Sequence, residues 1–253
     1  MSDVVTSLQN QRVKDAVKLR DRRGRDKQQR IIIDGLREIS RALDAGLAWQ
    51  EAFICEQLLP DEGRRVADAL TAAGAELIPV TTQVFSKVAF GDRHEGVVAT
   101  AKMPRCALHE LRVPSLPTVA VLEGIEKPGN LGAILRTADA AGISAVILAD
   151  PNTDLFNPNV IRASQGAVFA LPLAQGSTSD VIDWLHTREF QILAALVDAE
   201  LNYTQASFAP PCAIVLGSEA DGLTEPWRAS GVTGIRLPMH RKVYSLNVSV
   251  TAA

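Results

Sequence analysis

The chain has 253 residues, of which 47% are apolar and 22% charged, with a formal net charge of −3. Such a composition is typical of a globular protein with a packed core and excludes a disordered, charge-rich chain. No apolar run approaches the ~18 residues of a membrane span, and the N-terminal stretch lacks the apolar core of a secretion signal. We therefore expect a soluble protein without a membrane partner.

The cysteines and histidines give no metal or disulfide pattern. The three cysteines lie far apart, at positions 55, 106 and 212, and the four histidines are scattered. This spacing fits neither a zinc site nor a redox pair, and an odd number argues against a disulfide framework. We expect no metal site and a location in the reducing cytoplasm.

Positive charge gathers near the N-terminus. Residues 12–30 contain nine Lys and Arg against three Asp, a local excess of six. A segment of this kind attracts polyanions, so we expect contact with RNA or phosphate. The alternative is a solvated helix face with no specific contact. The candidate RNA contacts are Arg22, Arg23, Arg25 and Arg30.

The first part of the chain predicts a small α/β unit. Apolar runs and helical spacing, with glycine stops at 46 and 74, predict these elements in order. The strands are expected at 30–33, 51–56, 75–80 and 95–103, and the helices at 36–45, 61–73 and 81–90. Pro104, Pro114 and Pro117 then indicate a linker. We divide the chain into a domain of residues 1–105, a linker of residues 106–117 and a second domain of residues 118–253.

The second part alternates strand and helix. Near-continuous apolar strands are expected at 118–124, 145–150, 167–173, 191–197, 213–218 and 234–239. Helices are expected to begin near Asn130, Asn157, Ser179, and Leu223 or Glu225. This alternation predicts an α/β fold with a mostly parallel sheet that is covered on both faces.

Three polar loops follow strands of this sheet, and ligands of open α/β sheets bind beyond the carboxyl ends of strands. In "EGIEKPGNLGAILRT", Asn130 can cap a helix, and Arg136 lies six positions later on a different face. A helix-borne arginine can hold a phosphate through two hydrogen bonds. The alternative is a surface arginine beside a structural cap.

The other two loops are "VLGSEADGL" and "LPMHRKVYSLNVSVTAA". The first places Gly217 and Glu219 after a strand, and the second places Ser245 and Asn247 at a helix start. In both, the alternative is an ordinary capped turn. Dinucleotide, P-loop and nucleophile-elbow motifs do not occur in the sequence. From the residues alone we predict a ligand-binding α/β domain and a basic module, but no particular reaction.

Taken in order, "GNLGAILRT", "GSEADGL" and "LPM…SLNVS" resemble the three motifs of the SpoU/TrmH family of RNA ribose 2′-O-methyltransferases, in the SPOUT superfamily. The resemblance covers roughly residues 118–253. The first part is similar, through "DGLREISRALDAG" and "HEGVVATA", to the substrate-binding domain of ribosomal RNA members. The resemblance implies a deep trefoil knot in the second domain, a small α/β/α RNA-binding domain before it, S-adenosylmethionine as cofactor, and a homodimer.

Carried over residue by residue, the resemblance implies which side chains form the cofactor pocket. Gly217, Leu237 and Leu246 are expected to line it, with Pro238, Met239 and Ser245 close by. Gly217 suits this place because a Cβ atom there would obstruct a ligand that lies against the backbone.

The resemblance also implies that Arg136 is the catalytic residue and contacts RNA. Arginine is ordinarily always charged, so Arg136 would serve either as a strongly perturbed general base or as a grip on the phosphate beside the target ribose. The remaining motif positions, with a catalytic or a structural role, are Asn130, Glu219, Ser245 and Asn247. Methyl transfer from a sulfonium requires no metal.

We therefore expect methylation of a ribose 2′-hydroxyl in RNA, with 23S ribosomal RNA favoured by the extra N-terminal domain. Three alternatives stay open: a transfer RNA methyltransferase, a non-catalytic RNA-binding or ribosome-assembly factor on the same scaffold, and a nucleotide-dependent enzyme with an ordinary doubly wound fold. Family chains usually continue past "SLNVSV", so we expect the last helix to be incomplete at Ala253.

Overall fold

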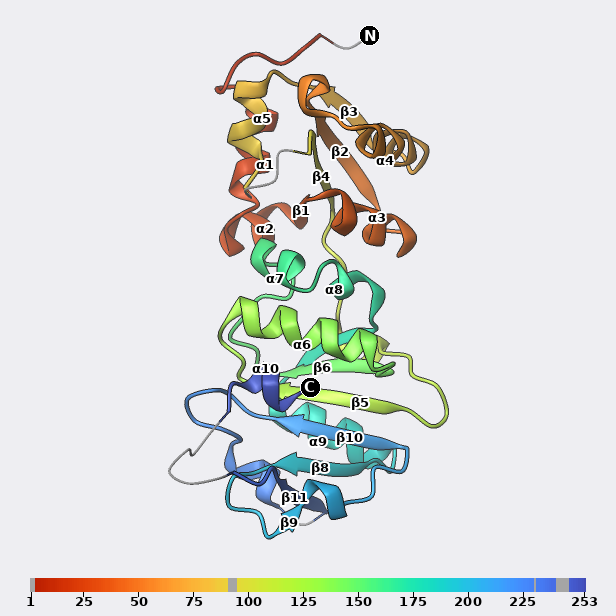
Figure 1. Cartoon of the computed structure of the whole chain (residues 1–253), viewed down its shortest axis with the longest axis vertical. Helices are drawn as coiled ribbons and strands as arrows, with labels where there is room; N and C mark the ends of the chain where they lie inside the picture. Colours follow the sequence, from red (N-terminus) through yellow and green to blue (C-terminus); the bar gives the residue numbers. More distant parts are fainter. Residues whose placement is uncertain (1–2, 91–94, 230, 240–245) are drawn as a thin grey trace. The chain divides into compact units, whose positions relative to one another are not determined.

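The computed structural model describes residues 3–90, 95–229, 231–239 and 246–253. The chain forms two compact units (Figure 1). Unit 1 contains residues 1–105 and 155–170, and unit 2 contains residues 106–154 and 171–253. Residues 155–170, which the sequence places in the second domain, thus group with the N-terminal residues.

Unit 1 is built on a four-stranded sheet with the order β1-β4-β2-β3. Strands β1 and β2 pair antiparallel with β4, and β2 pairs parallel with β3. The strands are β1 (Arg30–Asp34), β2 (Trp49–Ile54), β3 (Glu76–Pro79) and β4 (Val97–Lys102). The helices are α1 (Gln11–Lys18), α2 (Arg22–Gln28), α3 (Leu36–Asp44), α4 (Asp61–Ala72), α5 (Thr82–Val88), α7 (Pro158–Ala163) and α8 (Ala167–Ala170), with a 3-10 turn η1 (Glu56–Leu58).

The alternation of side chains along these strands creates two apolar faces. On one face, Ile32, Phe53 and Val98 form a core with Val13 of α1 and Phe85 of α5. Helices α3 and α4 contact strands β1 and β2 and each other. Figure 1 shows them on the side of the sheet away from α1 and α5. The expected strands and helices of this part are confirmed, and the fold is the expected small α/β unit.

Unit 2 is built on a seven-stranded sheet with the order β7-β6-β5-β10-β8-β11-β9. All the strand pairs described in it are parallel, which confirms the predicted parallel sheet. The strands are β5 (Thr118–Glu123), β6 (Ala145–Ala149), β7 (Leu173–Gly176), β8 (Gln191–Ala195), β9 (Leu201–Asn202), β10 (Cys212–Leu216) and β11 (Val232–Arg236). The helices are α6 (Pro128–Ala140), α9 (Thr178–Thr187) and α10 (Val248–Thr251), with 3-10 turns η2 (Leu108–Glu110), η3 (Tyr203–Gln205) and η4 (Glu225–Arg228).

The central strands of unit 2 are apolar except at their ends because the sheet is buried on both faces. Val121, Ile147 and Val215 on one face join Trp184 of α9 and Trp227 of η4 in a single cluster. The chain reverses its direction across the sheet after β7, so right-handed crossovers place α6 and α9 on opposite faces.

One predicted strand, residues 167–173, is wrong. Residues 167–170 form the short helix α8, and β7 begins only at Leu173. Gly166 has φ +82° and accepts a bond from the Phe169 amide, which starts a helical turn. Ala167, Val168 and Phe169 are buried in that turn. A short, fully buried apolar run has no periodicity that distinguishes a helix from a strand.

Within the described parts of the chain, none of the helices is long and apolar enough to cross a membrane. The same residues contain no cluster of His, Cys, Asp and Glu suited to a metal ion. A trefoil knot is expected in the C-terminal part of the chain, of which residues 240–245 lie outside the described residues, so the knot stays a prediction.

Candidate active site

A pocket of about 370 Å³ lies at the carboxyl ends of β8, β10 and β11 in unit 2. This is the edge where ligands of parallel α/β sheets bind, and the volume is that of a small-molecule site. Four segments form its walls: residues 195–197 after β8, residues 216–222 after β10, residues 235–239 around the end of β11, and residues 246–251 around α10.

The predicted pocket residues come together here. Gly217, Leu237, Met239 and Leu246 all line the pocket, although they lie in three separate segments of the chain. Pro238 lies between two lining residues and is exposed. Ser245 lies outside the described residues.

Gly217 has a structural reason in addition to the expected one. A Cβ atom on Gly217 would lie 2.2 Å from the carbonyl carbon of Gly222 and 2.4 Å from the amide nitrogen of Leu223. The loop closes on itself at this point, because the Ser218 amide donates to the Gly222 carbonyl at 3.0 Å. The glycine therefore permits the loop after β10 to fold tightly against its own backbone.

The three motif loops meet through side-chain hydrogen bonds. The side-chain Nδ2 of Asn130 donates to Oε1 of Glu219, and Nδ2 of Asn247 donates to Oδ1 of Asn130 at 3.3 Å. Oδ1 of Asn247 also accepts from the Ser249 amide at 2.9 Å and so caps α10, as expected. One polar chain thus joins α6, the loop after β10 and the start of α10.

The expected capping role of Asn130 is wrong. Helix α6 begins earlier, at Pro128, with Lys127 as its N-cap. Proline is pre-organised for the first helical position, so the helix starts two residues before Asn130. The Asn130 side chain is consequently available for Glu219 and Asn247.

Glu219 has an unused oxygen beside the pocket. Its Oε2 atom is buried and has no hydrogen-bond partner among the described residues, and Glu219 lines the pocket. An unpaired buried carboxylate oxygen is unfavourable, so this atom suits a hydrogen-bond donor or a positive group of a ligand.

Arg136 is not part of this polar chain. It lies on the exposed side of α6 and has no hydrogen bond or ion pair with any described residue. It does not line the pocket. A guanidinium in this position can bind an external anion without first breaking an internal bond.

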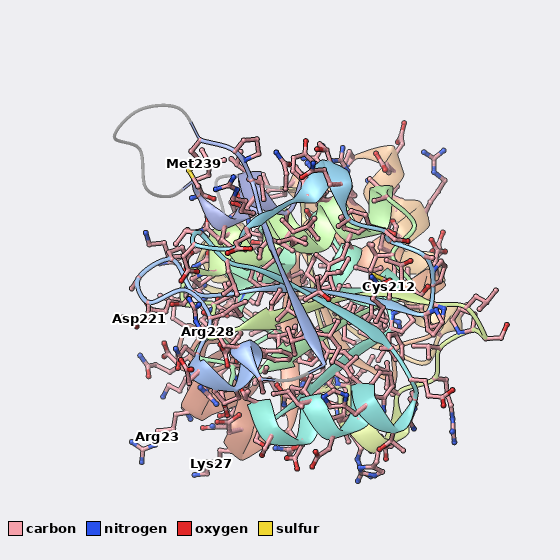
Figure 2. The ribbon with its side chains drawn as sticks, turned by 90° about the horizontal axis from the view of Figure 1, so that it is seen from below. Arg23, Lys27, Cys212, Asp221, Arg228 and Met239 are labelled. Atoms are coloured by element: carbon pink, nitrogen blue, oxygen red, sulfur yellow. The ribbon has the colours of Figure 1, made fainter. Side chains whose placement is uncertain are left out.

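The wall of the pocket formed by residues 195–197 is fixed by an ion pair that the sequence does not indicate. Both guanidinium nitrogens of Arg228 bind Asp198, at 2.9 and 3.1 Å, and the bond holds the pKa of Asp198 below its usual value. Figure 2 shows Arg228 on the same side as Asp221, which lies in the loop after β10. The lining residues Leu196, Val197 and Thr251 were also missed, because the position of β8 next to β10 is not visible in the sequence.

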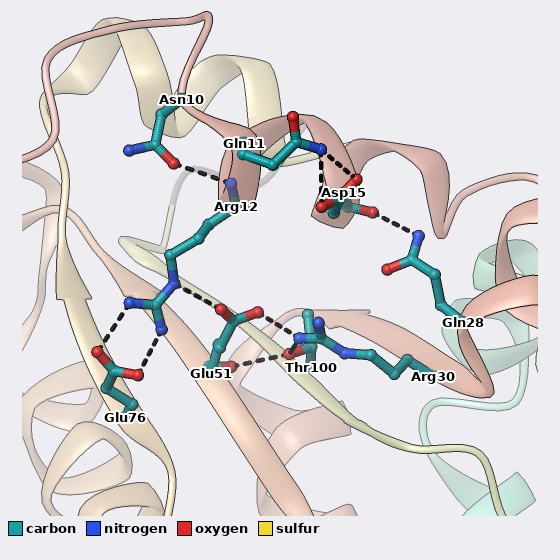
Figure 3. A network of polar contacts seen from close by, with 9 residues as sticks. All are labelled: Asn10, Gln11, Arg12, Asp15, Gln28, Arg30, Glu51, Glu76 and Thr100. Atoms are coloured by element: carbon teal, nitrogen blue, oxygen red, sulfur yellow. Dashed lines mark hydrogen bonds and ion pairs between the residues drawn. The ribbon is translucent and has the colours of Figure 1, made fainter.

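Four arginines of the N-terminal basic segment stabilise unit 1. Nε of Arg12 binds Glu51 at 2.6 Å, and its other nitrogens bind Glu76 at 2.8 and 2.6 Å (Figure 3). Arg30 pairs with the other oxygen of Glu51 and donates to Thr100 at 2.6 Å. This network joins α1 to all four strands of the unit 1 sheet.

Arg20 and Arg25 bind backbone carbonyls. Arg20 donates to the carbonyls of residues 87–89 at the end of α5. Arg25 is 1% exposed and donates to the carbonyls of Leu19 and Arg20, at 2.8 and 2.7 Å, where α1 ends. Arg25 and Arg30, both expected to contact RNA, are therefore held inside unit 1.

Exposed cations of the segment line a surface hollow between α1 and α2. Lys18, Arg23 and Lys27 line it together with Gly24, Gln28 and two carboxylates, Asp15 and Asp21, and Lys18 pairs with Asp15 at 2.9 Å. Gly24 lets α2 pack on the end of α1, because a Cβ atom there would lie 1.9 Å from the Lys18 carbonyl oxygen. Figure 2 shows Arg23 and Lys27 projecting away from the ribbon.

The fold and the pocket define an α/β protein with a small-molecule site at the carboxyl edge of a parallel sheet. Residues 117–253 match the model of the SpoU rRNA Methylase family, and residues 10–99 match that of the MRM3-like substrate binding domain. The chain belongs to the SpoU rRNA methylase family, which confirms the resemblance of the three motifs. It is thus a methyltransferase, and the reading as a nucleotide-dependent doubly wound enzyme is excluded.

Individual relatives resemble the chain over nearly its whole length. The 23S rRNA (guanosine(2553)-2′-O)-methyltransferase RlmP of Bacillus subtilis (strain 168) is 28% identical over 98% of this chain and 96% of its own. A solved RNA 2′-O ribose methyltransferase superposes with a TM-score of 0.84 and 41% identity, covering 99% of this chain and 95% of that one. The AdoMet-bound rRNA methyltransferase of Sinorhizobium meliloti superposes with a TM-score of 0.90 and 29% identity, covering 99% and 94%.

Proposed function

We propose that this protein transfers a methyl group from S-adenosylmethionine to a ribose 2′-hydroxyl of ribosomal RNA. The observation that carries the proposal is that the second and third family motifs line one pocket and that the first motif is joined to both through the bonds of Asn130 to Glu219 and Asn247. The relatives described above include a 23S ribosomal RNA methyltransferase and a ribosomal RNA methyltransferase, which favours ribosomal RNA, and 23S RNA in particular, over transfer RNA.

The residues at the pocket suit the cofactor. S-adenosylmethionine, when bound, supplies an electrophilic methyl group on a positively charged sulfur. Apolar side chains of Leu216, Ile235 and Val248 offer a dry wall for its ring system, and the unpaired Oε2 atom of Glu219 offers a partner for its positive charge. The backbone of the tight loop at Gly217 would form the remaining wall.

Arg136 is proposed to hold the RNA phosphate beside the target ribose. Its exposed side chain and its lack of described partners support this role better than that of a base, because a general base must first lose its proton. Fixing the phosphate would restrict the 2′-hydroxyl to the direction in line with the breaking bond. Asn130 and Asn247 would keep α6 and α10 in register beside the pocket.

Exposed cations of unit 1 are proposed to bind the RNA backbone. The proposed surface consists of Arg22, Arg23, Lys18 and Lys27, of which Lys18 and Arg22 form surface ion pairs with Asp15 and Asp26, at 2.9 and 3.8 Å. Arg25 and Arg30 are left out because both bind groups inside unit 1. We further propose a homodimer: Leu246 and Val250 beside α10 are 42% and 59% exposed, as expected of apolar residues that a second copy covers. A cytoplasmic location also stays a prediction.

Two measurements test the enzyme. Calorimetric titration with S-adenosylmethionine is expected to show binding by the unaltered protein and by Arg136→Ala, because Arg136 does not line the pocket. Transfer of a labelled methyl group to ribosomal RNA is expected to fall by about 100-fold or more in Arg136→Ala. Arg112→Ala, at another exposed arginine of unit 2, serves as the control and should transfer normally.

The results of these measurements distinguish the proposed methyltransferase from the alternative functions. Normal turnover by Arg136→Ala would remove that residue from the mechanism. RNA binding without any methyl transfer would favour the non-catalytic assembly factor. Mapping of 2′-O-methyl groups in cellular RNA with and without the gene would identify the target, and a missing mark in transfer RNA would favour that alternative.

The RNA surface has its own test. Neutralising Arg22, Arg23 and Lys27 together is expected to weaken RNA binding. The slope of the logarithm of the binding constant against the logarithm of the salt concentration should become shallower by up to about one for each lost phosphate contact. Neutralising Arg37, Arg64 and Arg65, three exposed arginines of unit 1 that do not line the hollow, provides a charge-matched control. An unchanged salt slope would rule out the hollow as an RNA contact.

A further inference from the structure

Glu123 is a buried carboxylate at the carboxyl end of β5. It is 3% exposed and forms no ion pair with any described Lys or Arg. A charged group in this position requires hydrogen-bond donors, because burial otherwise disfavours it strongly. Glu123 does not line the pocket, and the proposed mechanism does not use it.

Three hydrogen bonds surround this carboxylate. Oε1 accepts from the hydroxyls of Thr178, at 2.7 Å, and Thr224, at 2.6 Å. Oε2 accepts from the Thr224 amide at 2.8 Å. Thr178 is the first residue of α9, and Thr224 directly precedes η4. Two of the three bonds therefore hold a single residue, Thr224.

Thr224 is the far end of the loop that carries the second motif. Strand β10 pairs with β5 so that Leu216 lies opposite Leu122, which places Gly217 level with Glu123. The loop starts at Gly217, where its backbone is tightly packed, and ends at Thr224. Residues 217–222 between these two points line the pocket, and one of them is Glu219.

We infer that Glu123 is a positioning residue for the cofactor pocket, which acts by clamping Thr224 and thereby the conformation of the loop at residues 217–222. This inference rests on the proposed function. Without the clamp, the loop populates other conformations, and the apparent dissociation constant rises in proportion to the loss of the binding-competent fraction. Cofactor at saturation restores that fraction, so KM is expected to change and kcat to stay nearly constant.

Two matched variants separate positioning from general stability. Thr224→Val and Thr178→Val each remove one hydroxyl from the same oxygen of Glu123, but only Thr224 belongs to the loop. We expect Thr224→Val to raise the dissociation constant for S-adenosylmethionine about tenfold, the equivalent of one hydrogen bond to a charged group, and Thr178→Val to change it less than about twofold. Both should lower the melting temperature by similar amounts.

The carboxylate itself is tested by two further changes. Glu123→Gln keeps an oxygen for the Thr224 amide, and its amide group can face the two hydroxyls after they rotate, so binding should stay within about threefold of the unaltered protein. Glu123→Ala removes all three acceptor contacts and should weaken binding on the order of 100-fold. If Glu123→Ala does not fold, the comparison of Thr224→Val with Thr178→Val still tests whether Glu123 positions the loop.

Hydrogen exchange provides a readout that requires no cofactor. The amides of Ser218 and Gly222 bond to each other's carbonyls within the loop, at 3.0 and 3.2 Å. They should exchange faster in Thr224→Val than in Thr178→Val. Equal exchange and equal dissociation constants in the two variants would overturn the inference. Failure of the unaltered protein to bind S-adenosylmethionine would instead overturn the proposed function, and the exchange result would still stand.

Discussion

Replacement of Gly217 by alanine is the strongest single perturbation of the pocket. The added Cβ atom would lie 2.2 and 2.3 Å from the carbonyl carbon and oxygen of Gly222 and 2.4 Å from the Leu223 nitrogen, whereas real Cβ atoms essentially never come within 3.0 Å of a neighbour. All three atoms belong to the backbone, so a side-chain rotation cannot relieve the overlap. The loop must open by about 1 Å, at a cost of about 3 kcal/mol, the upper end of ordinary overpacking.

Two assays measure this effect. At about 3 kcal/mol, the melting temperature should fall by roughly 6–12 °C for a chain of this size. Calorimetric titration with S-adenosylmethionine should show binding at least about 100-fold weaker, because the same loop lines the pocket.

Two glycines provide matched controls. Gly222 in the same loop has φ +70° and no atom within 4 Å of an added Cβ, so Gly222→Ala should cost only about 1–2 kcal/mol of left-handed strain. Gly129 in the first turn of α6 also has open space, and Gly129→Ala should stabilise the protein by about 0.4–1 kcal/mol. The steric argument is refuted if Gly217→Ala melts and binds like Gly222→Ala.

Three further predictions concern other parts of the chain. Glu51→Gln should lower the unfolding free energy by about 2–3 kcal/mol in urea titrations, because Arg12 and Arg30 both lose their shared, partly buried partner; the exposed Glu62→Gln should have almost no effect. Arg12 lowers the pKa of Glu76, so this carboxylate stabilises the folded protein at pH values above its ordinary pKa near ~4. The stabilisation disappears as the pH falls through the lower pKa that Glu76 has in the folded protein. Glu76→Gln should therefore make the unfolding free energy fall less steeply in acid, and an unchanged dependence on pH would contradict the pairing. Burial raises the pKa of Cys106 to about 11, so at pH 8 iodoacetamide should alkylate it on the order of 100-fold more slowly than a free cysteine; equal rates in the native and urea-unfolded protein would contradict this.

The parallel sheet of unit 2 was predictable because β6 is apolar at every position and β5 at all but its first and last, as burial on both faces requires. The short helix at 167–170 was not, since a helix of four apolar residues is too short to show a period. Strand order is likewise absent from local patterns, so the neighbouring positions of β8 and β10, and with them the pocket wall formed by residues 195–197, could not be anticipated.

The sequence likewise predicts some residues of the site and misses others. Asn130, Glu219 and Asn247 were found through the family motifs, and hydrogen bonds join all three of them in the structure. Net charge along the chain does not say where a guanidinium points, so buried Arg25 was counted with exposed Arg23. The bond of Glu123 to Thr224 spans 101 positions, and neither residue has a local feature that indicates the other.

The central position of β5 has a consequence for biosynthesis. One edge of β5 pairs with β6, which follows soon after it, but the other edge pairs with β10, which begins only at Cys212. At cellular rates of translation, that open edge waits on the order of 5–20 s for its partner to be made. Nascent chains of this protein therefore present an unpaired apolar strand during elongation, a natural substrate for ribosome-associated chaperones and a point of aggregation when synthesis stalls.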